Sequence, residues 1–144
     1  MNTMLPSSAG RPAPAPTPET SPFWEAAAQG RLRLQICAAC EELIFPPAGY
    51  CPACLSQALV WRELSGRGRL RAWTELFLPA FPGAPKPAVI AEVEPVEGRA
   101  AVLAMLTEAE PGTLHLGAPV SIRFARDANG WSYPYAVPDP EARP

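Results

Sequence analysis

Apolar and polar residues alternate in several short segments of the chain. In residues 31–36, Leu32, Leu34 and Ile36 alternate with polar side chains, which predicts a half-buried strand. Further strands are predicted over residues 60–64, 69–78, 88–94, 99–107, 120–124 and 131–135. Turn residues separate most of these segments, and five or six short strands in succession predict a small barrel or sandwich.

One short helix is predicted before the first strand. A capping serine and a proline at residues 21–22 favour a helix start, and Gly30 favours its end, which gives a helix over residues 22–29. A helix of this length is not stable alone in water. Its adjacent aromatic residues, Phe23 and Trp24, must therefore pack on the body of this protein or insert into the surface of a partner.

Proline changes the picture of the fold class. The chain has 20 prolines among 144 residues, and proline breaks helix interiors and central strands, so a helical bundle is excluded and a mostly β fold remains. Residues 1–19 are predicted to be a disordered leader rich in proline and alanine, and residues 139–144 a disordered tail. The ordered part then divides into residues 20–60 and residues 61–138.

Charge and hydropathy exclude some classes of partner. The formal net charge of −2 gives no global attraction to nucleic acid or to an anionic membrane. The longest uncharged stretch, residues 43–61, contains too many prolines for a membrane span. The N-terminal segment lacks the basic start and apolar core of a secretory signal, which favours a cytoplasmic protein.

The four cysteines form two C-x-x-C pairs separated by ten residues: Cys37 with Cys40, and Cys51 with Cys54. Two such pairs can complete a tetrahedral thiolate site, which favours one zinc ion. Four protein ligands leave no open coordination position, so the zinc would be structural. A mononuclear iron centre remains an alternative, as does disulfide or redox chemistry.

Two further groups of residues are candidate contacts for a ligand or partner. Phe45, Pro46 and Pro47 lie between the cysteine pairs in a stiff loop, which is either a rigid connector or a preorganised contact. On a strand, the period-two residues Arg67, Arg69, Arg71 and Trp73 would share one face. That face could hold phosphates and stack a base, in a small anionic ligand or in single-stranded nucleic acid, or it could simply be solvated.

The sequence contains no recognisable catalytic motif. His115, the only histidine, lies between two leucines near a glycine and is a poor candidate for a catalytic base. A nucleophile elbow, a phosphate-binding loop and a paired-carboxylate motif are all missing. We therefore expect no catalytic residues in this chain.

The order of the parts resembles the rubredoxin-like zinc-ribbon/OB-fold family, which is often called acyl-CoA-associated. The resemblance covers residues 20–138 and rests on a Phe-Trp helix, G-R-L-R-L-Q-I-C-A-A-C, F-P-P, C-P-A-C and a late G-A-P-V-x-I-x-F. It implies a short N-terminal helix, a zinc ribbon with the four cysteines as ligands, and a five-stranded OB barrel.

The same resemblance implies a function. Members of the family accompany thiolases, thiolase-like acyltransferases or hydratase-type subunits as non-catalytic partners that complete or bridge an acyl-CoA site. The family often carries an arginine directly after Phe-Pro-Pro, where this chain has Ala48. The expected function is thus an accessory subunit with acyl-CoA as a shared ligand. The alternatives are a nucleic-acid-binding module and a rubredoxin-like electron carrier.

Overall fold

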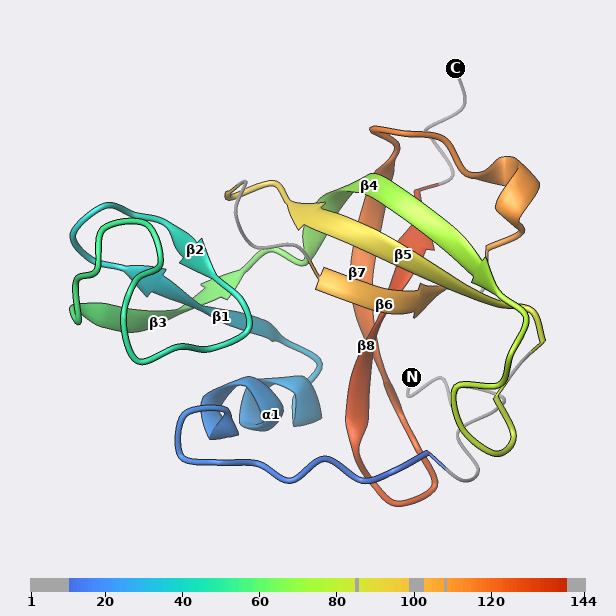
Figure 1. Cartoon of the computed structure of the whole chain (residues 1–144), viewed down its shortest axis with the longest axis horizontal. Helices are drawn as coiled ribbons and strands as arrows, with labels where there is room; N and C mark the ends of the chain where they lie inside the picture. The colour runs from blue at the N-terminus through green and yellow to red at the C-terminus, as the bar shows by residue number, and fades with distance from the viewer. Residues whose placement is uncertain (1–10, 85, 99–102, 108, 140–144) are drawn as a thin grey trace.

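In the part of the chain that the structure describes, one α-helix, a small three-stranded sheet and a five-stranded closed barrel make up most of the fold (Figure 1). The computed structural model describes residues 11–84, 86–98, 103–107 and 109–139. The elements, in chain order, are α1 (Ser21–Ala28), β1 (Leu32–Cys37), β2 (Leu43–Ile44), β3 (Leu59–Leu64), β4 (Arg67–Leu76), β5 (Ala88–Pro95), β6 (Leu103–Thr107), the 3-10 helix η1 (Pro111–Thr113), β7 (Pro119–Arg126) and β8 (Ser132–Pro138). The mostly β fold with one short α-helix confirms the prediction.

The small sheet has the order β2-β1-β3, with both pairs antiparallel. Leu32 pairs with Leu64 at one end of β1, and Cys37 pairs with Leu59 at the other. The two-residue strand β2 was not predicted from the sequence, because two residues are too few to show alternation. Gly30, with a φ of 71°, turns the chain from α1 into β1 as expected.

The barrel has the strand order β4-β5-β6-β8-β7, and β7 returns to pair with β4. The first three strands form an antiparallel meander, and β8 pairs parallel to β6 and antiparallel to β7. This is the five-stranded Greek-key arrangement of an OB barrel, which confirms that expectation. The chain turns sharply between β3 and β4 at Gly66, which has a φ of 74°.

A bulge in β4 contradicts one of the sequence predictions. Leu70 pairs with Val93 and Ala72 pairs with Glu92, so Arg71 is the extra residue. Beyond the bulge, Trp73 pairs with Ala91, which is buried, and Trp73 packs against the main core. Trp73 therefore lies on the inner face of the sheet, and the prediction that it shares a face with the arginines is wrong.

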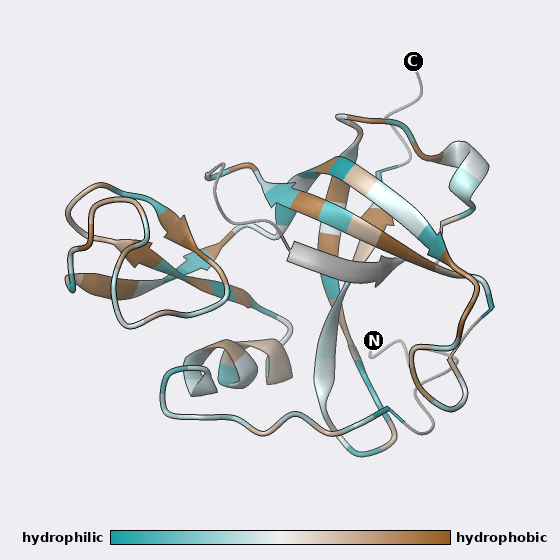
Figure 2. Ribbon diagram, viewed as in Figure 1, coloured by the Kyte–Doolittle hydropathy of each residue, from teal (hydrophilic) through white to brown (hydrophobic). Residues whose placement is uncertain are grey.

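The hydrophobic core is continuous from the small sheet into the barrel. Figure 2 shows brown residues alternating with teal ones along β4 and β5 and concentrated along β1 and β2. The buried members come from α1, the small sheet, the barrel strands and the β6–β7 connection: Phe23, Leu32, Leu34, Ile36, Leu43, Leu64, Leu70, Val89, Ala91, Val93, Leu114, Ala118, Val120, Ile122 and Ala136. The β5–β6 turn seals the junction, because a Cβ on Gly98 would lie 2.6 Å from Cδ1 of Leu43.

The N-terminal segment contacts the barrel at Arg11 and Pro12, and the disordered leader over residues 1–19 stays a prediction. Residues 11–16 have no regular secondary structure, and Figure 1 shows the segment (dark blue) crossing the end of the β7–β8 hairpin. The hydroxyl of Tyr133 donates a hydrogen bond to the carbonyl of Pro12 over 3.3 Å. The remainder of the predicted leader, residues 1–10, and residues 140–144 of the predicted tail lie outside the described residues.

No helix in the described part of the chain is long and apolar enough to cross a bilayer.

Candidate metal centre and predicted contact residues

The two cysteine pairs sit on two loops that have the same backbone structure. In the first, the N–H of Cys37 donates to the carbonyl of Glu42 over 2.9 Å, and the N–H of Glu41 donates to the carbonyl of Cys37 over 2.8 Å. In the second, Cys51 makes the equivalent bonds to Ser56 and Leu55, both over 2.8 Å. The repeated C-x-x-C spacing therefore produces two equivalent knuckles.

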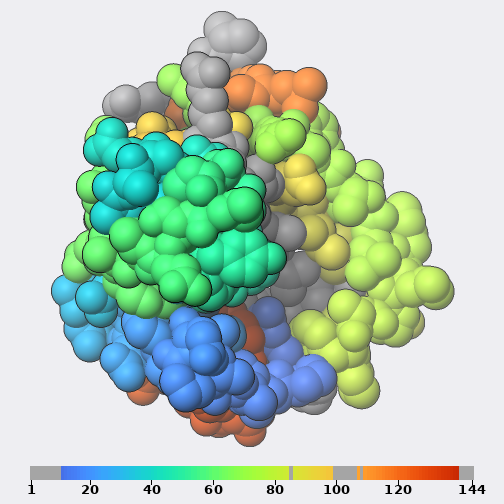
Figure 3. Space-filling view, turned by 60° about the vertical axis from the view of Figure 1, so that its left-hand side comes forward, coloured from blue at the N-terminus to red at the C-terminus, as the bar shows by residue number. Residues whose placement is uncertain are grey.

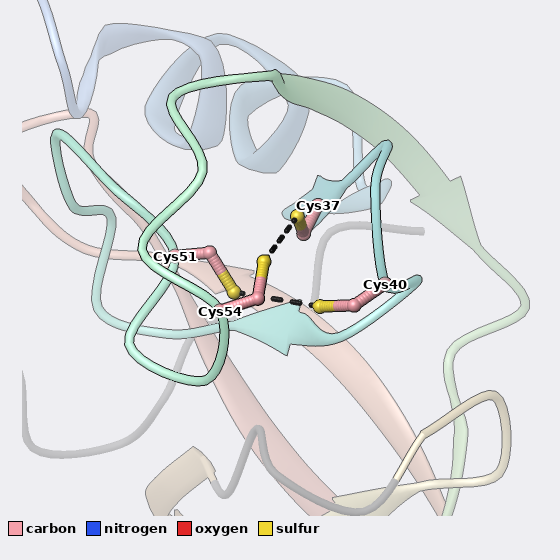
Figure 4. Close-up of side chains that lie close together, drawn as sticks. All are labelled: Cys37, Cys40, Cys51 and Cys54. Atoms are coloured by element: carbon pink, nitrogen blue, oxygen red, sulfur yellow. Dashed lines mark hydrogen bonds between the residues drawn. The ribbon is translucent and has the colours of Figure 1, made fainter.

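The four sulfur atoms converge between the knuckles (Figure 4), and all lie within 4.8 Å of one another. The Sγ atoms of Cys37 and Cys54 are 3.6 Å apart, as are those of Cys40 and Cys51. Tetrahedral zinc with Zn–S bonds of about 2.3 Å requires S···S separations of about 3.8 Å. A disulfide requires about 2.05 Å, so all four cysteines are free thiols arranged for one metal ion.

The electrostatics of the cluster favour a cation. Burial acts to raise the pKa of Cys37, but backbone N–H groups of Cys40 and Ala39 outweigh it and lower that pKa to about 6. At Cys40 the backbone N–H of Glu42 acts to lower the pKa, and the neighbouring Cys54 thiol and burial raise it to about 12. One thiolate thus forms readily, and further thiolates need a positive charge between them.

Each knuckle holds one residue in the left-handed region: Glu41 has a φ of 61° and Leu55 a φ of 63°. This conformation costs an L-residue roughly 1–2 kcal/mol, and glycine avoids that cost. The Leu55 side chain is 71% exposed, so removing it sacrifices little packing. We expect Leu55→Gly to raise the free energy of unfolding by about 0.5–1 kcal/mol, after the greater chain entropy of the unfolded glycine variant is subtracted.

Chemical denaturation of the zinc-loaded protein measures this change. Leu55→Ala is the matched control, because it removes the side chain and keeps the Cβ that makes the conformation costly. A Leu55→Gly variant no more stable than Leu55→Ala would show that the knuckle stores no backbone strain at this position.

The Phe-Pro-Pro loop between the knuckles is held against the body of the protein. The ring of Phe45 is half-buried and lies 5.7 Å from that of Phe23, between centroids. The N–H of Ala48 donates to Oε1 of Gln35 over 2.8 Å. Pro46 is exposed and Pro47 is half-buried. The loop is thus a connector anchored at both ends, with Pro46 at its surface.

Phe23 and Trp24 both find partners within this protein, because α1 lies between the small sheet and the barrel. The Phe23 ring is buried beside Phe45, and the Trp24 ring makes edge contacts at 5.8 Å with both Trp131 and Tyr133 of the β7–β8 hairpin. Figure 3 shows the zinc ribbon, which is the small sheet with its two cysteine loops (cyan and green), above the helix and leader (blue). Of the two readings of this aromatic pair, packing on the body of the protein holds in this structure.

The three arginines of β4 are exposed, but acidic residues lie beside them. Arg69 pairs directly with Glu94 on β5, and its guanidinium donates to the carbonyl of Gly117 over 3.3 Å. Arg71 occupies the bulge, with Glu92 paired to the next residue of β4. The outer face therefore carries mixed charge without an aromatic platform from Trp73.

Sequence reasoning missed Gln35. Its place in the alternating pattern predicts an outward side chain, yet it is 7% exposed and its amide oxygen holds the Phe-Pro-Pro loop through Ala48. The signal available in the sequence was its position between Leu34 and Ile36, two residues before a metal-ligating cysteine. A buried polar group without a hydrogen bond is costly. The burial of Gln35 therefore implies a hydrogen-bond partner, but the sequence did not show that burial.

The chain is similar to known proteins in sequence and in fold. Two family models match adjacent parts of the chain: the rubredoxin-like zinc ribbon domain of ChsH2 over residues 24–60, and the C-terminal OB-fold domain of ChsH2 over residues 61–125. A curated protein of Thermomonospora curvata, named "Probable enoyl-CoA hydratase alpha subunit", is 36% identical over 110 residues. The match covers 76% of this chain and 34% of that protein, so the chain spans about a third of that relative's length.

Two solved structures are also similar. One, described as an Ltp2–ChsH2 (DUF35) aldolase, contains a chain with 31% identity and a TM-score of 0.76, covering 88% of this chain and 98% of that one. The other is a DUF35-family protein of unknown function from Sulfolobus solfataricus, with 18% identity, a TM-score of 0.58, and coverage of 73% and 77%. The second match shows a shared fold alone.

Proposed function

Because the chain belongs to the ChsH2 (DUF35) family of rubredoxin-like zinc ribbons joined to OB-fold domains, we propose that it is a zinc-binding accessory subunit of an acyl-CoA-processing enzyme. It docks on a thiolase-like or hydratase-like catalytic subunit and helps to complete or gate the acyl-CoA site of that subunit. The chain itself supplies no catalytic residue. One structural zinc ion, held by Cys37, Cys40, Cys51 and Cys54, fixes the ribbon.

The observation that carries this proposal is the match to nearly the whole of a chain in a structure described as an Ltp2–ChsH2 aldolase. That description pairs a ChsH2 protein with a second protein in one enzyme. The name of the Thermomonospora curvata relative connects a similar sequence with an enoyl-CoA hydratase. The first description gives an aldolase of two named proteins, and the second gives one subunit of a hydratase, so both support an assembly of more than one chain.

The surface of the chain supports a partner. Large apolar side chains are exposed on the ribbon, at Tyr50, Leu55 and Val60, and on the β4–β5 loop, at Phe77 and Leu78. Such side chains are costly to leave in water when they gather in patches, and patches of this kind mark interaction sites. Among the contact residues expected from the sequence, Pro46, Arg67, Arg69 and Arg71 are exposed and available to a partner.

The nucleic-acid-binding alternative is not favoured by the structure of β4. It required three arginines and an aromatic ring on one face, and Trp73 lies on the opposite face of the sheet. Glu94 and Glu92 further reduce the positive potential of the arginine face. This arrangement offers neither the stacking platform nor the basic groove that single-strand binding needs.

Co-expression with a catalytic partner tests the proposal. We expect a thiolase-like or hydratase-like chain encoded beside this one to co-purify with it as a stable complex. The catalytic chain alone should turn over acyl-CoA substrates at least about tenfold more slowly than the complex, a barrier difference of roughly 1.4 kcal/mol. Steady-state assays of each chain and of the reconstituted mixture measure this difference.

The purified accessory chain should show no turnover with any acyl-CoA offered. A mixture with an unrelated thiolase serves as the control for non-specific stabilisation. Robust thiolysis or hydration by the single chain, or full activity of the catalytic chain without it, would contradict the proposal.

A further inference from the structure

The side chain of Arg11 lies in an aromatic site on the barrel. Its guanidinium carbon is 3.5 Å from the centroid of the Tyr133 ring and 5.8 Å from that of Phe81. Both separations are within the range of cation–π attraction. The adjacent hydrogen bond from the Tyr133 hydroxyl to the carbonyl of Pro12 fixes the backbone beside it. Three segments that are distant in sequence therefore meet at one cation.

A buried carboxylate lies on the same β7–β8 hairpin as Tyr133. Asp127 is 5% exposed at the start of the β7–β8 turn, where Oδ1 accepts the N–H groups of Asn129 and Trp131 over 2.9 and 2.8 Å. Its other oxygen, Oδ2, is buried and has no hydrogen-bond partner among the described residues. A buried carboxylate is costly unless a positive charge compensates it.

The electrostatic coupling of these groups agrees with their placement. Burial lowers the pKa of Arg11, whereas the charges that Tyr133 and Asp127 carry when ionised act to raise it. An arginine stays protonated in proteins, so Arg11 supplies a permanent positive charge that acts on Asp127. A planar guanidinium is also less strongly hydrated than an ammonium group and stacks better on a ring.

We propose that Asp127, Tyr133 and Phe81 form a guanidinium-binding site and that Arg11 of the same chain occupies it. The N-terminal segment is therefore a strap, and Arg11 is its anchor. The strap joins the β7–β8 hairpin to the β4–β5 loop, which carries the exposed Phe77 and Leu78. Figure 3 shows the leader (dark blue) reaching this loop (yellow-green) along the lower edge of the molecule.

The site can be tested by replacing its occupant. In an Arg11→Ala variant of the full chain, methylguanidinium should bind in the vacated site and shift the backbone amide NMR signals of Asn129 and Trp131. The shifts should saturate at millimolar concentrations. The unmodified protein should bind methylguanidinium with an apparent affinity at least about tenfold weaker, because Arg11 of the same chain competes for the site. Methylammonium is the ligand control and should not saturate.

Two variants separate this site from general surface effects. Arg62→Ala removes an exposed arginine on β3 and should create no methylguanidinium site. Asp127→Asn, combined with Arg11→Ala, keeps the Oδ1 acceptor of the turn and removes the charge, so methylguanidinium binding should weaken at least about fivefold. Equal binding by unmodified protein and Arg11→Ala, or unsaturable shifts in Arg11→Ala, would overturn the proposal.

A second measurement requires no substitution. Nuclear Overhauser effects between the Arg11 side chain and the Tyr133 ring should appear in the unmodified protein, and their absence would also overturn the strap. These experiments involve no catalytic partner, so their outcome is independent of the proposed accessory function.

Discussion

Replacing Cys51 with serine should reduce the zinc content of the purified chain from one ion to nearly none. Cys51 is fully buried, and its sulfur lies 3.6 Å from that of Cys40. The serine hydroxyl stays protonated at neutral pH and does not replace a thiolate ligand. The variant would therefore have three cysteine ligands and a buried hydroxyl at a site that needs four ligands. Metal analysis of protein purified without chelator measures the change.

The loss should extend beyond the ribbon. Structural zinc contributes about 10–16 kcal/mol of apparent binding free energy in zinc-finger peptides, which exceeds the stability of most small domains. The ribbon also shares one hydrophobic core with the barrel. We therefore expect Cys51→Ser to lose its cooperative thermal transition or to aggregate, and a strong chelator to have the same effect on the unmodified protein.

Ala53→Ser is the matched control, because it adds a hydroxyl to the same knuckle at an exposed position without touching a ligand. It should retain one zinc ion and a normal melting temperature. A Cys51→Ser variant that kept its full zinc content would show that the four cysteines do not act as one ligand set. A red protein with ferric absorbance would instead identify iron at this site.

Gly68→Ala should destabilise the barrel by about 3 kcal/mol, the upper end of the cost of overpacking. Gly68 is buried where β4 pairs with β5. A Cβ on Gly68 would lie 2.4 Å from Cγ1 of Val93 and 2.9 Å from the carbonyl oxygen of Glu94. Val93 is fully buried and the carbonyl belongs to the backbone, so neither can move away freely. The expected fall in melting temperature is roughly 10 °C.

Gly112→Ala provides the comparison. No atom lies within 4 Å of a Cβ built on Gly112, and its φ is ordinary, so the substitution should be neutral or slightly stabilising. Thermal melts of the two variants, loaded with equal zinc, measure the difference between them. If the melting temperature of Gly68→Ala equalled that of Gly112→Ala, the close approach of β4 to β5 would not require a glycine at position 68.

The strands and the metal centre could be predicted from the sequence because each rests on local spacing. Alternation in residues 31–36 placed β1, and two C-x-x-C pairs were enough to infer a four-sulfur site. Both signals are properties of near neighbours in the chain. The choice of a five-stranded OB barrel over a sandwich came from the family resemblance, because alternation alone does not say which strands pair.

The failures share a different cause, which is that they depend on contacts between distant segments. The bulge at Arg71 reverses the face of Trp73, and a bulge is defined only by the partner strand. The packing of Trp24, which the sequence left open between two alternatives, likewise depends on the β7–β8 hairpin, more than 100 residues later in the chain. The contact of Arg11 with the Tyr133 ring also joins distant segments, and no local pattern announces it.

The continuous core has a mechanical consequence for any assembly. Leu43 of the ribbon rests against the β5–β6 turn, and the bend that links β3 to β4 is tied to β7 by a hydrogen bond from the N–H of Ile122 to the carbonyl of Gly66 over 2.6 Å. Packed cores of this kind do not deform gradually. A partner that binds the zinc ribbon would therefore displace the ribbon and the barrel together as one rigid body. A movement at the zinc end would also move the opposite end of the molecule.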